Sequence, residues 1–276
     1  MKKFWFLLPA ALVLAALMLI PGRSRETVLP VLLYHAFCPE ESGVSSSVWV
    51  SADRLEEQLA ALKEAGYRSV PLADLIAGKR LPEKPILITA DDGYLDNLTV
   101  AAPIFEKYGF TLAVAVIGVS EGKDTYKETG VPIIPHFSLE QAQPWVEKGV
   151  IELFSHTYDL HLGDLDPEGH RHSVTRLEGE SDEQYLEALR ADFDRSMAQL
   201  AGLGVPALAY PHGEYSEIAE QAARDAGFQI TMTTETGINR ITPGRPEDLR
   251  LLRRNMVTNR ETGADLVAGL EAMAMQ

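Results

Sequence analysis

Short apolar segments alternate with longer helical stretches along most of the chain, and this alternation constrains the fold more than any other feature. The alternation is typical of βα units arranged around a parallel sheet. Eight segments are predicted to be strands: 29–34, 67–70, 85–89, 110–117, 150–154, 207–210, 229–233 and 251–257. Seven or eight parallel strands with helices between them predict an α/β fold, a distorted (β/α) barrel.

Capping residues mark the intervening helices. A helix is predicted over 97–108, ending at Gly109, because glycine readily adopts the left-handed conformation that stops a helix. Ser138 and Ser181 each begin a capping box, in which side chain and backbone satisfy each other's hydrogen bonds at a helix start.

The N-terminus carries a separate signal. Lys2 and Lys3 precede an apolar run over 4–20, which is the order of charge and hydrophobicity in an export signal. Residues 1–22 are therefore expected to be a signal peptide or membrane anchor, followed by one large domain over 28–276. The two lysines would keep the N-terminus inside and place that domain outside the cytosol, either anchored or secreted.

Charge and cysteine content exclude some classes of protein. The formal net charge of -15 opposes nucleic-acid binding, which depends on Lys and Arg replacing phosphate counterions. Cys38 is the only cysteine, so neither an intramolecular disulfide nor a cluster of thiolate metal ligands can form.

Polar clusters stand where four of the predicted strands end, and in a parallel barrel those ends share one face. The clusters are expected to converge there. They lie at 34–35, 91–93, 155–161 and 211–213.

Within these clusters, Asp91 and Asp92 directly follow a run that should be buried, so their charges need a metal or hydrogen-bond partners. An Asp-Gly turn that caps a helix is the alternative. His156 and His161 are five residues apart, and a loop at a strand end could aim both at one ion. One carboxylate and two imidazoles form the three-ligand set of a catalytic zinc-type site with an open position for water.

Three segments carry a family resemblance. Residues 89–97 read TADDGYLDN, residues 102–109 read APIFEKYG, and residues 155–161 read SHTYDLH. In order and spacing they strongly resemble the polysaccharide deacetylase family, carbohydrate esterase family four. Residues 209–215, AYPHGEY, resemble its third motif, and the likeness runs from about 30 to 257. The resemblance implies a metal-dependent hydrolase that removes N-acetyl groups from polymeric or oligomeric N-acetylglucosamine of a cell wall or exopolysaccharide.

By this resemblance Asp91 is the general base, while Asp92, His156 and His161 hold a divalent metal. Zinc is the expected metal, with cobalt, nickel and manganese as alternatives. A backbone N–H near His212 is the expected second donor to the oxyanion. Three further residues are expected to contact substrate: Tyr94, Pro211 and Tyr215.

The chain departs from the family pattern at two positions. The usual Phe before the acid pair is Ala90, which should alter packing more than mechanism. The third motif in many members has an Arg two residues before its Pro, where this chain has Ala209, so the usual partner of the base is missing. Arg254 is the candidate replacement, although it could equally be a surface arginine beside Arg253.

The general acid also departs from its usual place. Many members use a histidine in a late motif, but no histidine follows His212 here. His35 ends the first predicted strand, which a barrel brings beside the last, and resembles the early Tyr-His motif of the branch that deacetylates exopolysaccharide. His35 is therefore the predicted acid, with His172 as the next candidate, and a histidine held by ordinary hydrogen bonds is the alternative reading.

Other functions stay open at this point. A glycoside hydrolase needs two carboxylates several ångströms apart across the scissile bond, which the adjacent Asp91 and Asp92 suit poorly. A non-catalytic carbohydrate-binding module could keep the metal residues but would not need Asp91. An O-acetyl ester is a further alternative substrate.

Overall fold

The structure is a computed structural model that describes residues 26–40, 48–161 and 171–275. The signal or anchor expected at 1–22 lies outside these residues. The strands are β1 (Thr27–Leu29), β2 (Val31–Tyr34), β3 (Ala36–Cys38), β4 (Trp49–Ser51), β5 (Arg68–Ser69), β6 (Pro85–Ala90), β7 (Leu112–Val116), β8 (Ile151–Ser155), β9 (Gly204–Ala209), β10 (Ile230–Met232), β11 (Asn239–Ile241) and β12 (Asn255–Met256).

The α-helices are α2 (Ala52–Glu64), α3 (Leu72–Ile76), α4 (Ala102–Tyr108), α5 (Leu139–Glu147), α6 (Asp182–Gln199), α7 (Glu217–Asp225) and α8 (Gly263–Ala274). The described residues also form four shorter helices, η2 (Asn97–Ala101), η3 (Gly118–Ser120), η4 (Pro211–Gly213) and η5 (Pro246–Leu249). Within the described parts of the chain, no helix has both the length and the apolar composition needed to cross a membrane.

The main sheet is parallel and curls into a distorted barrel. Its strand order is β10-β9-β8-β7-β6-β2-β12, and β5 pairs with the start of β6 beside this path. The two ends of the path meet at a bridge between Met232 and Leu252, where Leu252 N–H donates to the Thr231 carbonyl at 2.8 Å. The prediction of seven or eight parallel strands in an α/β fold is therefore confirmed.

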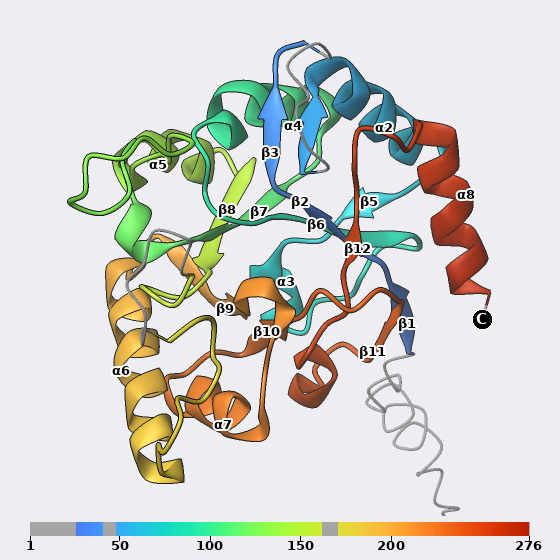
Figure 1. The fold of residues 1–276 in the computed structure, drawn as a ribbon. Helices are drawn as coiled ribbons and strands as arrows, with labels where there is room; N and C mark the ends of the chain where they lie inside the picture. The colour runs from blue at the N-terminus through green and yellow to red at the C-terminus, as the bar shows by residue number, and fades with distance from the viewer. Residues whose placement is uncertain (1–25, 41–47, 162–170, 276) are drawn as a thin grey trace, which may run out of the picture.

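The barrel core lies on both faces of the sheet. All six residues of β6 are buried, with Ile86 and Ile88 packed in one apolar cluster and Leu87 in another. Burying one such side chain stabilises a fold by about 1.5–3 kcal/mol. Figure 1 shows α2 beside α8 at one side of the sheet and α6 beside α7 at the other. The helices thus flank the sheet on two sides.

Both predicted capping boxes form, at the starts of α5 and α6. The single helix predicted over 97–108 is wrong in one respect, because its first turn is the π-helix η2 and only α4 is α-helical. Pro103 explains the break, since a continuous α-helix would need an N–H from residue 103 and proline has none. Gly109 ends α4 with a φ of 73°, as predicted.

Candidate active site

The polar clusters at the ends of four strands meet on one face of the barrel. His35 follows β2, Asp91 and Asp92 follow β6, and His156 follows β8. His212 lies in η4, directly after β9, and its ring is 4.7 Å from the ring of His161. The convergence expected from the sequence is observed.

Asp92, His156 and His161 form a compact group of metal-binding side chains. One ligand atom from each lies within 4.8 Å of the others. Asp92 Oδ1 is 3.6 Å from His156 Nε2 and 3.5 Å from His161 Nε2. Asp92 and His156 are buried, whereas His161 is partly exposed, so the group opens toward solvent on one side.

The hydrogen bonds of this group fit a bound cation. His156 Nδ1 donates to the Ala209 carbonyl at 2.8 Å, because a carbonyl can only accept, and this leaves the Nε2 lone pair facing Asp92. Asp92 Oδ1 is buried and has no hydrogen-bond partner among the residues that the structure describes. A buried carboxylate oxygen with no donor is costly, and a divalent cation between it and the imidazoles would satisfy it.

The protonation states of these side chains also suit a bound metal ion. Burial lowers the pKa of His156 to about 4, so its ring is neutral and can act as a ligand at neutral pH. Burial by itself would raise the pKa of Asp92, but the neighbouring His161, His35 and His156 lower it below its usual value. The carboxylate is therefore ionised, as a metal ligand must be.

Asp91 is held by Arg254. The two guanidinium nitrogens Nη1 and Nη2 donate to Asp91 Oδ1 and Oδ2 at 2.7 and 2.8 Å, and Arg254 Nε donates to the Thr233 carbonyl at 2.8 Å. Arg254 is fully buried, so it is not a surface arginine. Burial raises the pKa of Asp91, but Arg254 outweighs this effect and keeps the pKa well below its usual range. Asp91 Oδ2 lies 3.7 Å from His156 Nε2, beside the ligand group.

Two residues that the sequence did not single out hold the backbone at and just after His35. Asn97 Nδ2 donates to the His35 carbonyl at 2.8 Å, and Asp96 accepts the N–H of Phe37 at 3.0 Å. The imidazole Nδ1 of His35 is buried and finds no hydrogen-bond partner within residues 26–40, 48–161 and 171–275. Asp96 and Asn97 end the segment TADDGYLDN, so their place in that motif was the available signal.

Asp192 is a third residue that the sequence did not reveal. It lies on α6, and its two carboxylate oxygens accept the N–H groups of Tyr158 and Asp159 at 2.8 and 2.7 Å. It thereby shapes the turn between His156 and His161. No local pattern connects residue 192 with that turn.

Backbone strain gathers at the site. Asp92, Thr157 and His212 have φ values of 76°, 71° and 57°, in the left-handed region that non-glycine residues avoid. Each such residue costs about 1–3 kcal/mol and persists only where the surrounding structure enforces it. Gly213 is required after His212, because a Cβ on it would lie 2.5 Å from the backbone nitrogen of Thr234.

The three expected substrate-contacting residues occupy different environments. Burial and the neighbouring charge of Asp92 raise the pKa of the Tyr94 hydroxyl, and the Tyr94 ring packs 5.0 Å from that of His136. Pro211 is buried, and its carbonyl accepts the hydroxyl of Ser173 at 2.8 Å. Tyr215 is 43% exposed.

Comparisons with known proteins identify the family. The model of the family described as polysaccharide deacetylase matches residues 78–231. The Bacillus subtilis (strain 168) protein YxkH, named as a candidate polysaccharide deacetylase, is 30% identical over 255 residues, which are 91% of this chain and 78% of that protein.

A second curated protein and a solved structure are also similar to this chain. The poly-beta-1,6-N-acetyl-D-glucosamine N-deacetylase of Escherichia coli (strain K12) is 25% identical over 249 residues, 79% of this chain but only 37% of that protein. The solved structure of IcaB from Ammonifex degensii is 28% identical, with a TM-score of 0.70 over 88% of this chain and 97% of that chain. With its barrel, its ligand group and a family match over more than half of its length, this chain belongs to the polysaccharide deacetylase family.

Proposed function

We propose that this protein is a metal-dependent N-deacetylase that removes acetyl groups from N-acetylglucosamine residues of a polysaccharide. One observation carries the proposal: the ionised Asp91 lies beside the ligand group of Asp92, His156 and His161 without belonging to it. A binding module would need only the ligand group. The extra carboxylate, held in place by a buried arginine, supports hydrolysis.

Amide hydrolysis needs a proton acceptor for the attacking water and a proton donor for the departing amine. Asp91 is the proposed acceptor, and Arg254 keeps its carboxylate charged and fixed in orientation. His35, on the neighbouring strand end, is the proposed donor, and Asn97 fixes the backbone that carries it. A divalent metal, zinc by expectation, would supply Lewis acidity to the acetyl carbonyl and to the water.

Oxyanion stabilisation is assigned to the backbone at His212. His212 has a φ of 57°, in the left-handed region, within the short helix η4. A backbone donor fixed in this way would stabilise developing charge without reorganising. The carbonyl of His212 accepts the hydroxyl of Thr234 at 3.2 Å, which restrains the peptide.

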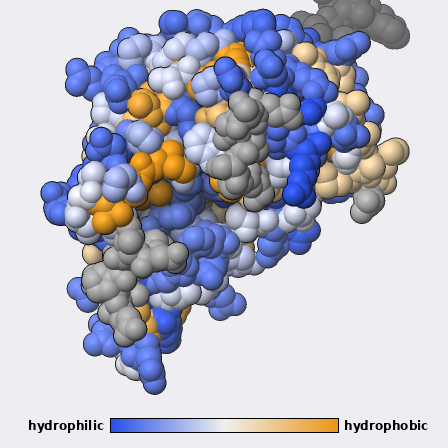
Figure 2. Space-filling model, turned by 45° about the horizontal axis from the view of Figure 1, so that its top comes forward, coloured by the Kyte–Doolittle hydropathy of each residue, from blue (hydrophilic) through white to orange (hydrophobic). Residues whose placement is uncertain are grey.

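The substrate class rests on the relatives. A relative is named for poly-beta-1,6-N-acetyl-D-glucosamine, and this name supports an amino-sugar polymer here. The face drawn in Figure 2 is largely hydrophilic, with hydrophobic residues in separate patches. Such amino-sugar polymers lie outside the cytosol, so we propose extracytoplasmic action, with 28–276 as the catalytic domain.

Acetate release from defined oligosaccharides tests the proposal. The metal-loaded protein should release acetate from N-acetylglucosamine oligomers and leave their length unchanged. Chain shortening would indicate a glycoside hydrolase, and binding without release would indicate a non-catalytic module. Comparison of β-1,6-linked, β-1,4-linked and O-acetylated substrates under the same conditions identifies the linkage and the bond attacked.

A further inference from the structure

A hollow of about 530 Å³ opens beside the candidate active site, between the start of α6 and the start of α7. One wall comes from residues 174–176 and the other from residues 214–218. The charged and aromatic residues that line it are Arg176, Asp182, Tyr185, Glu214, Tyr215 and Glu217.

The two walls of this hollow follow directly on residues that contact the candidate active site. The ring of His172 stacks on that of His212 at 4.5 Å and 21°, and His212 in turn lies 4.7 Å from the ligand candidate His161. The two walls begin two residues beyond His172 and His212. Ser173 Oγ donates to the Pro211 carbonyl at 2.8 Å, which joins the walls at the end nearest the site.

The hollow presents an oriented aromatic ring. Tyr215 stacks on the buried Tyr210 with ring centroids 6.3 Å apart, and its hydroxyl donates to Glu235 at 3.4 Å. These contacts restrain the ring, which nevertheless stays 43% exposed. A restrained, half-exposed aromatic ring offers an apolar face at little cost in side-chain entropy.

The charge of the lining is negative. Its one guanidinium, that of Arg176, is paired with Asp182 and lies 4.9 Å from the centre of the Tyr185 ring. Glu214 and Glu217 are exposed, and neither forms an ion pair with any residue that the structure describes. The carboxylates are therefore free to receive a cation that the ring and the walls position.

We infer that this hollow binds the sugar residue next to the one under attack, in its already deacetylated, ammonium form. The inference rests on the proposed function, because each turnover converts a neutral acetamide into an amine that is protonated at neutral pH. Tyr215 packs against the sugar ring, while Glu214 and Glu217 receive the ammonium group. The enzyme consequently prefers chains that it has already begun to deacetylate.

Two tetrasaccharides test this inference: one fully acetylated, and one with a single deacetylated residue next to an acetylated one. For the wild-type protein, kcat/KM should be about three- to tenfold higher on the second, a preference worth up to about 1.4 kcal/mol. Because exposed charges are screened, the preference should shrink at high salt. The preference should vanish in the double variant Glu214→Gln/Glu217→Gln. Tyr215→Ala should lower kcat/KM on both substrates, because it removes the ring. Tyr215→Phe keeps the ring and should keep most of kcat/KM.

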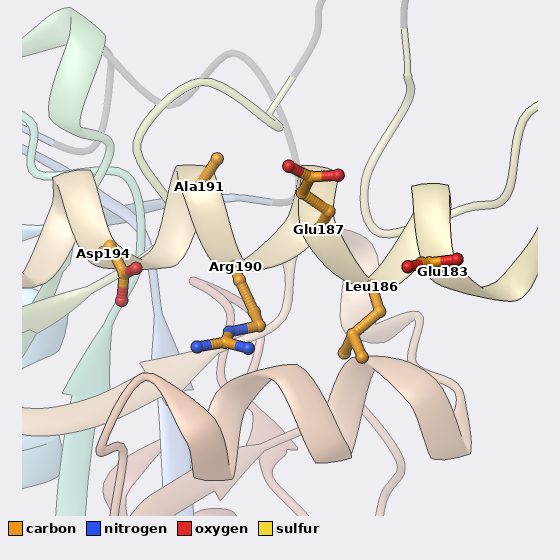
Figure 3. A pocket seen from close by; sticks show the side chains of 6 residues that line it. All are labelled: Glu183, Leu186, Glu187, Arg190, Ala191 and Asp194. Carbon is orange, nitrogen blue, oxygen red and sulfur yellow. The ribbon is translucent and has the colours of Figure 1, made fainter.

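A control for the loss of an exposed carboxylate comes from a different hollow, of about 570 Å³, along α6. Figure 3 shows that Leu186 and Arg190 point toward the neighbouring helix, whereas Glu187 points away from it. Glu187→Gln removes one exposed carboxylate at that place, so the preference should persist. Equal rates on the two tetrasaccharides in the wild type, or an unchanged preference in the double variant, would overturn the inference.

Binding to the Asp91→Asn protein separates this inference from the proposed function. Calorimetry on that variant measures the affinity for both tetrasaccharides without turnover. Tighter binding of the partly deacetylated chain supports the hollow as an ammonium-sugar site even if the wild-type protein releases no acetate. Equal affinity refutes it even if acetate release is normal.

Discussion

Replacing Arg254 by methionine should destabilise the protein and slow catalysis, because it leaves the carboxylate of Asp91 buried without a counter-charge. Asp91 and Arg254 are 2% and 0% exposed, and their two hydrogen bonds measure 2.7 and 2.8 Å. Removing one partner of such a pair costs about 3–5 kcal/mol. At about 2–4 °C per kcal/mol for a domain of this size, the melting temperature should fall by about 6–20 °C.

The assay is urea unfolding of four proteins: the wild type, Arg254→Met, Asp91→Asn and the double variant. Each single variant leaves one buried group unpaired, whereas the double variant removes both charges. The decrease in unfolding free energy in the double variant should therefore be smaller, by about 1–3 kcal/mol, than the sum of the decreases in the two single variants. The reasoning would be refuted if the decreases in unfolding free energy were additive, or if Arg254→Met lowered the unfolding free energy by less than about 1 kcal/mol.

A second ion pair controls for destabilisation alone. Arg250 Nε donates to Glu220 at 2.8 Å, away from the ligand group. Arg250→Met should lower stability but leave kcat near the wild-type value below its melting temperature. Arg254→Met should lower kcat about 10²-fold under the same conditions, because the base loses its fixed orientation. Arg254→Lys keeps the positive charge but loses the bidentate geometry, so its kcat should lie between that of the wild type and that of Arg254→Met.

Three further predictions concern the ligands, the acid and the folding of the site. His156→Ala should lower bound metal per protein measured by mass spectrometry, whereas Asp91→Asn should retain it; normal metal content in His156→Ala would remove that residue from the ligand set. His35→Asn should lower turnover on amides about 10²- to 10⁴-fold but spare activated esters, whose leaving groups need little protonation, and equal losses on both would move the acid elsewhere. Burial raises the pKa of Asp192 to about 6, above its unfolded value, so its ionisation should remove about 3 kcal/mol of unfolding free energy as pH rises from about 4 to 6. The difference between the wild type and Asp192→Asn in urea unfolding should fall over that range, and a constant difference would contradict the shift.

The strands of the barrel were predictable because burial on both faces leaves continuous apolar runs. The segment 85–89 is the clearest case, since β6 alternates between two apolar clusters. The short pairs β1 with β11 and β3 with β4 were missed, because three-residue strands carry no periodic pattern. The π-helix η2 was missed because the interruption depends on one absent N–H at Pro103, which hardly alters the apolar spacing.

The sequence by itself determined the succession of buried strands and capped helices, the acid pair after a buried strand and the paired histidines, because each depends on neighbours within a few residues. Tertiary structure alone decided which groups touch. Arg254 meets Asp91 across 163 positions of sequence, and Asn97 holds His35 across 62. The two walls of the hollow likewise come from separate βα loops. Such contacts depend on how the barrel closes, and closure depends on packing summed over the whole core, which no local pattern encodes.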